Sequence, residues 1–112
     1  MSESEHLSAF LVKKGGQLWH YCPACDDLHS VAIDEPYKNG SRWDFDGNVE
    51  KPSLSPSVKV TVCRTHDPDF ENKICHYFLK NGRFEYLSDC THKLAGMRIP
   101  MVEIPEKFIK YF

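Results

Sequence analysis

Several features that assign a chain to a well-known class are missing from these 112 residues. No run of eighteen apolar residues occurs, which excludes a membrane-spanning helix, and the acidic residues 1–5 lack the charge pattern of a signal peptide. Five like charges never follow one another, and the formal net charge of -2 disfavours a general binder of nucleic acid or membrane surfaces. We therefore expect a cytoplasmic protein whose partners include neither nucleic acid nor membrane.

Motifs of several familiar enzyme families are also missing. The sequence contains no Walker loop and no GxGxxG, the two common glycine-rich phosphate-binding patterns. It has no HExxH and no HxE…PCxxC arrangement, which excludes the common metalloproteases and zinc deaminases. No internal repeat or low-complexity segment is present either. Any catalysis must therefore use a different set of residues.

The size and composition suit one soluble globular domain spanning residues 1–112. A hydrophobic content of 41% and a charged content of 27% are typical of a chain that folds around a real core. The five cysteines are an odd number, and a reducing cytoplasm keeps thiols free. Metal binding therefore explains most of the cysteines better than a disulfide framework does.

Short runs with strand-like alternation dominate the chain. We expect strands at 7–12, 17–21, 31–33, 57–63 and 97–104. The turn Lys14-Gly15-Gly16 joins the first two as a hairpin, and Pro100 places the last strand at a sheet edge.

Other segments do not fit strands. Residues 52–56 are proline-rich and predict an extended loop, and the polar residues 65–73 predict a surface loop. Residues 91–96 are expected to form one helical turn, and the aromatic residues 108–112 either a last strand or an exposed docking tail. No segment has a long helical period. The predicted fold is therefore mostly β. It is a small β or α+β domain of antiparallel hairpins that a structural zinc site stabilises.

The clearest local signal is the dipeptide Asn81-Gly82, which favours a two-residue type I′ hairpin turn. Such a turn determines the register of its two strands. The predicted pairs are Lys80 with Arg83, Leu79 with Phe84, Tyr77 with Tyr86, and Cys75 with Ser88.

Because faces alternate along a strand, this register divides the hairpin into two sides. The side of Cys75, Tyr77 and Ser88 is apolar and predicts the core, and an extension by two residues adds Cys90 to it. The opposite side carries His76 with Asp89 diagonal to it, within hydrogen-bonding reach.

The sulfur-bearing residues predict a metal site. Cys22-Pro23-Ala24-Cys25 is a CxxC pair that supplies half of a tetrahedral zinc site, and Cys75 and Cys90 supply the other half. His29 and His92 are alternative ligands in a mixed site. Buried, inert cysteines are the competing interpretation. Cys63 has no predicted partner and is expected to be a free thiol.

A serine site is the other candidate for chemistry. Residues 52–57 place serines on a stiff, proline-bounded segment, and Ser55 and Ser57 are the candidate nucleophiles. A serine nucleophile needs a base and a group that orients the base, and His76 and Asp89 supply them. The competing interpretation is that these serines are ordinary loop residues.

At this point the sequence resembles a small family from phages, prophages and bacterial operons for ubiquitin-like conjugation, some members of which carry an ammonia monooxygenase label. The resemblance covers most of residues 19 to 104. It is carried by Tyr21-Cys22-Pro23-Ala24-Cys25 with His29, by Trp43-Asp44-Phe45-Asp46-Gly47, by Pro52-Ser53-Leu54-Ser55-Pro56-Ser57, by Cys75-His76-Tyr77-Phe78, and by Ser88-Asp89-Cys90-Thr91-His92-Lys93-Leu94-Ala95-Gly96. The family usually has Asn where this chain has Asp46, and Asp where it has Asn48. It also usually has Thr-Phe where this chain has Ser53-Leu54.

The resemblance implies a zinc-stabilised β domain that trims or removes ubiquitin-like proteins. It maps the metal to Cys22, Cys25, Cys75 and Cys90, and a serine triad to Ser55 or Ser57 with His76 and Asp89. It leaves His29 and His92 open to either group.

The leading hypothesis is a zinc-stabilised serine peptidase or hydrolase, similar to a deubiquitinase, that acts at the C-terminus of a ubiquitin-like protein. His76 would take the proton of the serine, Asp89 would orient His76, and backbone amides near Ser57 would hold the oxyanion. The alternative is a non-enzymatic zinc-binding module, a phage or prophage accessory protein that binds another protein. A third possibility is a metal-dependent hydrolase.

Overall fold

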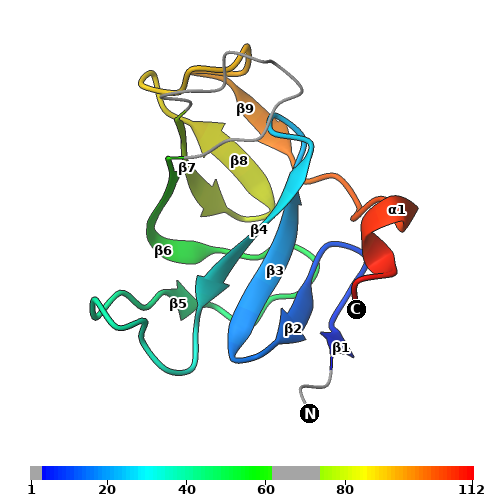
Figure 1. The fold of residues 1–112 in the computed structure, drawn as a ribbon. Coiled ribbons are helices and arrows are strands. Elements are labelled where there is room, and N and C mark those ends of the chain that lie inside the picture. Colours follow the sequence, from blue (N-terminus) through cyan, green and yellow to red (C-terminus); the bar gives the residue numbers. More distant parts are fainter. Residues whose placement is uncertain (1–3, 62–73) are drawn as a thin grey trace.

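The computed structural model describes residues 4–61 and 74–112, which form two antiparallel sheets and one short helix (Figure 1). The first sheet has the order β1-β2-β3-β4, with β1 Glu5–His6, β2 Val12–Lys14, β3 Gln17–Cys22 and β4 Asp27–Ala32. The second sheet has the order β5-β6-β7-β8-β9, with β5 Asp44–Phe45, β6 Leu54–Val60, β7 Cys75–Lys80, β8 Arg83–Tyr86 and β9 Arg98–Pro100. The mostly β prediction is confirmed. The predicted surface loop at 65–73 and Cys63, the predicted free thiol, lie outside the described residues.

Both predicted hairpin turns are present. Lys14 pairs with Gln17 across Gly15-Gly16, and both glycines have a positive φ, as a type I′ turn requires. Asn81 and Gly82 likewise have positive φ values of 49° and 75°. The pairing of β7 with β8 confirms the predicted partners Lys80–Arg83, Leu79–Phe84 and Tyr77–Tyr86.

One predicted pair of that hairpin is wrong. Ser88 does not pair with Cys75, because β8 ends at Tyr86, and Ser88 is exposed. The chain leaves the sheet after the Leu87 amide donates to the carbonyl oxygen of His76 at 2.9 Å. A turn then carries Asp89 and Cys90 back toward β7.

The prediction of a loop at 52–56 is also wrong in part, because β6 begins at Leu54. Pro56 is tolerated within this strand because the pairing of β6 with β7 shifts register between Leu54 and Val58. A proline has no amide hydrogen, and an interruption of the ladder is where that loss is harmless.

The C-terminal part differs from expectation at two places. Residues 91–96 form hydrogen-bonded turns rather than a helical turn, and residues 108–112 form neither a strand nor a free tail. Instead α1, Glu106–Ile109, begins after Pro105, and its aromatic end packs beside the first sheet (Figure 1). The predicted edge strand is confirmed in β9, which lies at the end of the second sheet. Within the described residues no helix is long and apolar enough to cross a membrane.

The core draws on both sheets. Leu11, Leu18 and Val31 from the side of the first sheet meet the face of the second sheet that carries Tyr77 and Phe84. We call this the inner face; as predicted, its members Cys75, Tyr77, Leu79, Phe84 and Tyr86 are all buried. The opposite, outer face of the second sheet carries the alternate residues of β7, which are His76, Phe78 and Lys80.

Candidate active site and metal centre

Three polar side chains meet on the outer face of the second sheet. The Ser57 Oγ atom lies 3.0 Å from His76 Nε2. His76 Nδ1 lies 3.0 and 3.2 Å from the two carboxylate oxygens of Asp89. The His76 side chain is 22% exposed and that of Asp89 is 45% exposed, so the group is accessible from solvent. A hydroxyl, an imidazole and a carboxylate in this order are the three parts of an activated serine.

The strand register brings these residues together. His76 lies opposite Lys59 on β6, and Ser57, two residues before Lys59, shares its face. Asp89 does not belong to a strand. The turn after β8 carries it to His76, and the neighbouring Cys90 is held to the His76 backbone at 3.1 and 3.2 Å.

The hydrogen bonds define the protonation of the neutral imidazole. A carboxylate only accepts, so the Nδ1–H of His76 donates to Asp89, and Nε2 accepts from the Ser57 hydroxyl. The hydrogen bond from His76 lowers the pKa of Asp89 below its usual value, and the nearby charge of Lys59 lowers it further. Asp89 is therefore ionised at neutral pH and suited to stabilise an imidazolium.

The two candidate nucleophiles differ in position. Ser55 lies opposite Asp44 of β5 and is exposed, whereas Ser57 is half-buried and bonded to His76. The structure thus brings Ser57, and not Ser55, to the imidazole.

Trp43 supports the backbone at Ser57. Its indole Nε1–H donates to the Ser57 carbonyl oxygen at 3.2 Å. The sequence offers no reason to place Trp43 in the site. The available signal was that a partly buried indole N–H usually finds an acceptor, but the sequence does not say which one.

A second cluster lies inside the molecule. Cys22 at the end of β3, His29 on β4 and Cys75 at the start of β7 place their ligand atoms within 4.8 Å of one another, and all three are buried. Two sulfurs and one imidazole nitrogen form a donor set that suits a zinc ion. Two of the predicted ligands, Cys22 and Cys75, and one alternative ligand, His29, are thus brought together.

The two cysteines share one proton. Their sulfurs lie 3.7 Å apart, and the hydrogen bond from Cys75 lowers the pKa of Cys22 to about 7. The Tyr86 hydroxyl, 3.2 Å from the Cys22 sulfur, adds to this effect. The same shared hydrogen bond, with burial, raises the pKa of Cys75. The pair therefore readily gives one thiolate, and a metal ion would favour loss of the second proton.

His29 is held as a neutral ligand. Burial lowers its pKa to about 4, so the imidazole is uncharged at neutral pH. Its Nδ1 lies 3.0 Å from the buried Tyr77 hydroxyl, which also bonds to His20 Nε2. Nε2 of His29 is then the nitrogen that remains for an ion. A hydrogen bond of this kind from the other ring nitrogen orients most metal-binding histidines.

His92 has a different relation to the cluster. Its Nδ1 accepts from the Leu94 amide at 3.2 Å, so the proton of the neutral ring is on Nε2. Nε2 lies 3.4 Å from the Cys75 sulfur and donates to it. His92 thus contacts one of the two sulfurs of the cluster.

The remaining two predicted metal ligands, Cys25 and Cys90, are not among the three residues of this cluster. Cys25 is fully buried and is disulfide-bonded in this structure. The Cys90 sulfur is bonded to the His76 backbone, and it also hydrogen-bonds to the Cys75 thiol, where it helps to raise the pKa of Cys75.

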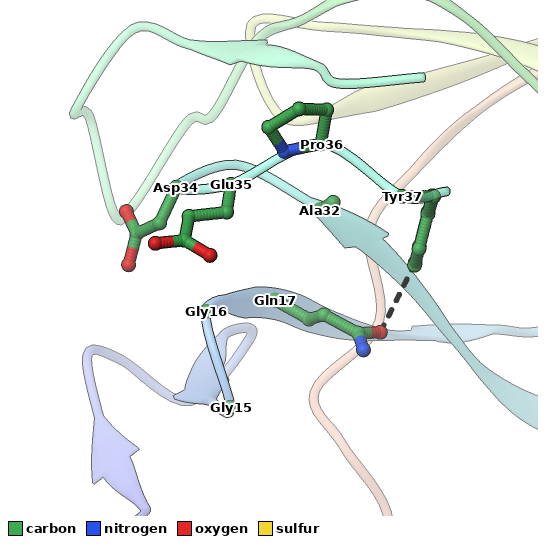
Figure 2. Close-up of a pocket in the computed structure, with 8 residues that line it drawn as sticks. All are labelled: Gly15, Gly16, Gln17, Ala32, Asp34, Glu35, Pro36 and Tyr37. Carbon is green, nitrogen blue, oxygen red and sulfur yellow. Dashed lines mark hydrogen bonds between the residues drawn. The ribbon is translucent and has the colours of Figure 1, made fainter. Parts of the chain in front are cut away.

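A cavity of about 480 Å³ opens beside the Gly15-Gly16 turn, and Figure 2 shows its lining. The Tyr37 hydroxyl donates to Gln17 across it at 3.1 Å, and the Asp34 carboxylate pairs with Lys13. None of the lining residues belongs to the serine group or to the cysteine cluster.

The chain was compared with models of known protein families. Residues 2–87 match the BubE family, described as a serine protease of bacterial ubiquitination-like systems. The matched range contains Ser57, His76 and the three residues of the buried cluster. No curated protein and no solved structure matches the chain.

Proposed function

Since the chain belongs to the BubE family of bacterial ubiquitination-like system serine proteases, we propose that it is a serine protease with Ser57 as nucleophile. The observation that carries the proposal is the hydrogen-bonded series from Ser57 through His76 to Asp89. We propose that its substrate is the C-terminal tail of a ubiquitin-like protein. The protein would cut this tail to trim a precursor or to release a conjugate.

The chemistry follows from the protonation of the three groups. Ser57 Oγ attacks the scissile carbonyl carbon while His76 Nε2 takes its proton, and Asp89 stabilises the imidazolium through Nδ1–H. Backbone amides near Ser57 would hold the oxyanion. His76 then gives the proton to the leaving amine, and an acyl enzyme remains on Ser57. A water molecule, deprotonated by His76, releases the acyl group as a carboxylic acid and restores the serine.

A fluorophosphonate probe tests the nucleophile directly. We expect one adduct by intact mass, mapped to Ser57 and absent in Ser57→Ala and His76→Ala. The matched control is Ser55→Ala, which should be labelled at the wild-type rate. No adduct on well-folded protein would contradict the proposal and favour the non-enzymatic binding module. An adduct on Ser55 would instead refute Ser57 as the nucleophile while keeping a serine hydrolase.

The substrate is tested separately with a ubiquitin-like protein of a bacterial ubiquitination-like system, extended by a short C-terminal segment. Wild-type protein should release the extension, and Ser57→Ala should bind the substrate without cleaving it. If Ser57 is labelled by the probe and no ubiquitin-like substrate is cut, the nucleophile stands and the substrate assignment fails.

We also propose that the buried cluster binds a structural zinc ion. Cys22, His29 and Cys75 would be ligands. Cys25, whose backbone amide bonds to the Cys22 thiol, would be the fourth once its disulfide is reduced. Three thiolates and one neutral imidazole are a common ligand set of closed, structural zinc sites. His92 and Tyr77 would orient Cys75 and His29.

Metal analysis of protein purified under reducing conditions tests the zinc proposal. We expect one zinc per chain, lost in Cys22→Ser, Cys75→Ser and His29→Ala. Cys90→Ser is the matched control and should keep its zinc. Metal-free, folded wild-type protein would refute the proposal, and retention by Cys25→Ser would remove Cys25 from the ligand set.

A further inference from the structure

A pocket lies on the outer face of the second sheet, beside the serine group. Its volume is about 390 Å³, within the lower range of small-molecule sites, which span about 300 to 1,000 Å³. Its lining consists of Asp44, Phe45, Asp46, Ser53, Leu54, Ser55, Phe78 and Lys80. Phe78 supplies the large apolar side chain of this face, and its ring is only partly buried.

The charged groups around the pocket already have partners. Asp44 pairs with Arg42 at 2.8 Å, and Asp46 accepts from the amides of Asn48 and Ser53 at 3.0 and 3.2 Å. The Lys80 ammonium lies 4.8 Å from the centre of the Phe78 ring. The two carboxylates, Asp44 and Asp46, and the two cations, Arg42 and Lys80, balance in number, so the pocket does not select strongly for a charged ligand. The contact it offers is apolar.

The pocket lies two strand positions away from the serine group. Phe78 follows His76 by two residues on β7 and shares its face, which corresponds to about 7 Å along a strand. Ser55, on the β6 side of the pocket, is likewise two residues from Ser57. An extended peptide whose carbonyl carbon is at Ser57 advances by a similar distance over two of its own residues.

We infer that this pocket is a specificity subsite for an apolar side chain in the substrate tail. The side chain belongs to the third residue on the acyl side, two positions before the residue that is attacked. It packs on the Phe78 ring, with the stem of Lys80 beside it. This inference rests on the proposed function, because it takes the tail of the substrate to be the acyl component of the reaction.

Peptidyl diphenyl phosphonates test the subsite. Each probe has glycine at the two residues nearest the phosphorus on the acyl side. The third residue is leucine, alanine, arginine or aspartate, so the probes differ only in the side chain that the pocket would receive. We expect the leucine probe to label Ser57 about tenfold faster than the alanine probe, since a few methylenes in an apolar pocket give selectivity of this size. The arginine and aspartate probes should be no faster than the alanine probe.

The Phe78→Ala variant should reduce the rate of the leucine probe to that of the alanine probe, and Phe78→Leu should retain most of the preference. A small alkyl fluorophosphonate, which is too short to reach the pocket, should label Ser57 at the wild-type rate in both variants and so report intact folding. Tyr111→Ala is the matched control, because it removes an exposed ring that does not line this pocket.

The outcomes separate the two proposals. If the small probe labels Ser57 but the wild-type protein shows no preference for leucine, or prefers arginine, the subsite is refuted and the nucleophile stands. A leucine preference that survives Phe78→Ala also refutes the subsite. If the small probe fails to label Ser57, the proposed function fails and the subsite fails with it. The order of the four probes by labelling rate is measured on wild-type protein alone, so a misfolded Phe78→Ala protein cannot obscure that result.

Discussion

The Cys90 thiol is bonded to both backbone groups of His76. Its sulfur accepts from the His76 amide at 3.2 Å, and its S–H donates to the His76 carbonyl oxygen at 3.1 Å. Burial raises the pKa of Cys90, which keeps the proton needed for the second bond. Cys90 therefore holds the turn after β8, which contains Asp89, against β7, which contains His76.

Replacing Cys90 tests this role as a positioning residue. Cys90→Ala removes both bonds and should lower the rate of Ser57 labelling about tenfold, because Asp89 loses its alignment with His76. Cys90→Ser keeps a donor and an acceptor and should restore most of the rate. The measurement is the labelling rate as a function of pH, since loss of the Asp89 contact changes the profile and a purely structural defect does not. Equal rates for Cys90→Ala and wild type would exclude the role.

Asp89→Asn should leave the fold intact and remove most of the reactivity of Ser57. An amide in place of the carboxylate favours the wrong tautomer of His76 and cannot stabilise the imidazolium. In a serine–histidine–aspartate group such a change costs a factor of about 10⁴ in rate. Labelling by the small fluorophosphonate, with melting temperature as a check on folding, measures the effect. A loss below about tenfold would mean that Asp89 does not orient the imidazole.

The Asp89–His76 bond also has a pH signature. The pKa of Asp89 is lower in the folded protein than its usual value, so the unfolded chain binds more protons as the pH falls through that range. The stabilisation is present above the usual pKa of aspartate, about 3.9, and is lost as the pH falls through the folded value. The melting temperatures of wild type and Asp89→Asn should therefore differ at pH 7 and converge at acidic pH. A difference that is constant with pH would argue against the hydrogen bond between His76 and the Asp89 carboxylate.

Trp43→Phe isolates the hydrogen bond from the indole to Ser57. Phenylalanine keeps an aromatic ring but leaves the Ser57 carbonyl without this donor. We expect a loss of about 1 kcal/mol in the free energy of unfolding, typical of one hydrogen bond, and a several-fold slower labelling of Ser57. Denaturant unfolding and labelling kinetics measure the two effects. Tyr37→Phe is a suitable control, since it removes one hydroxyl hydrogen bond on an exposed side chain that lines the other cavity.

Removal of the metal should act on activity through structure. Cys75 and His76 are neighbours on β7, and Cys75 faces the buried cluster while His76 faces the serine group. Under a strong chelator, Ser57 reactivity and near-ultraviolet circular dichroism should decline together, and both should return with zinc or cadmium. A loss of activity without a change in structure would instead indicate a metal that takes part in catalysis.

Much of this arrangement could be predicted from local sequence signals. The type I′ turn at Asn81-Gly82 determines the pairing of β7 with β8, and strand alternation then assigns Tyr77 to the core and His76 to the opposite face. The same alternation anticipated that Asp89 lies near His76. Failures occurred where strands end or are interrupted. Ser88 lies outside the sheet and Pro56 lies within a strand, because tertiary pairing overrides local propensity at such places.

The sequence by itself determined the residue types available for chemistry, the hairpin registers and the division of β7 into two faces, since turns and alternation act over a few residues. Only the tertiary structure decided which serine meets the imidazole and which histidine joins the two sulfurs. Ser57 and His76 are 19 residues apart, and Cys22 and Cys75 are 53 apart. Contacts over such separations depend on how β6 pairs with β7 and how the two sheets pack, and no short stretch of sequence carries that information.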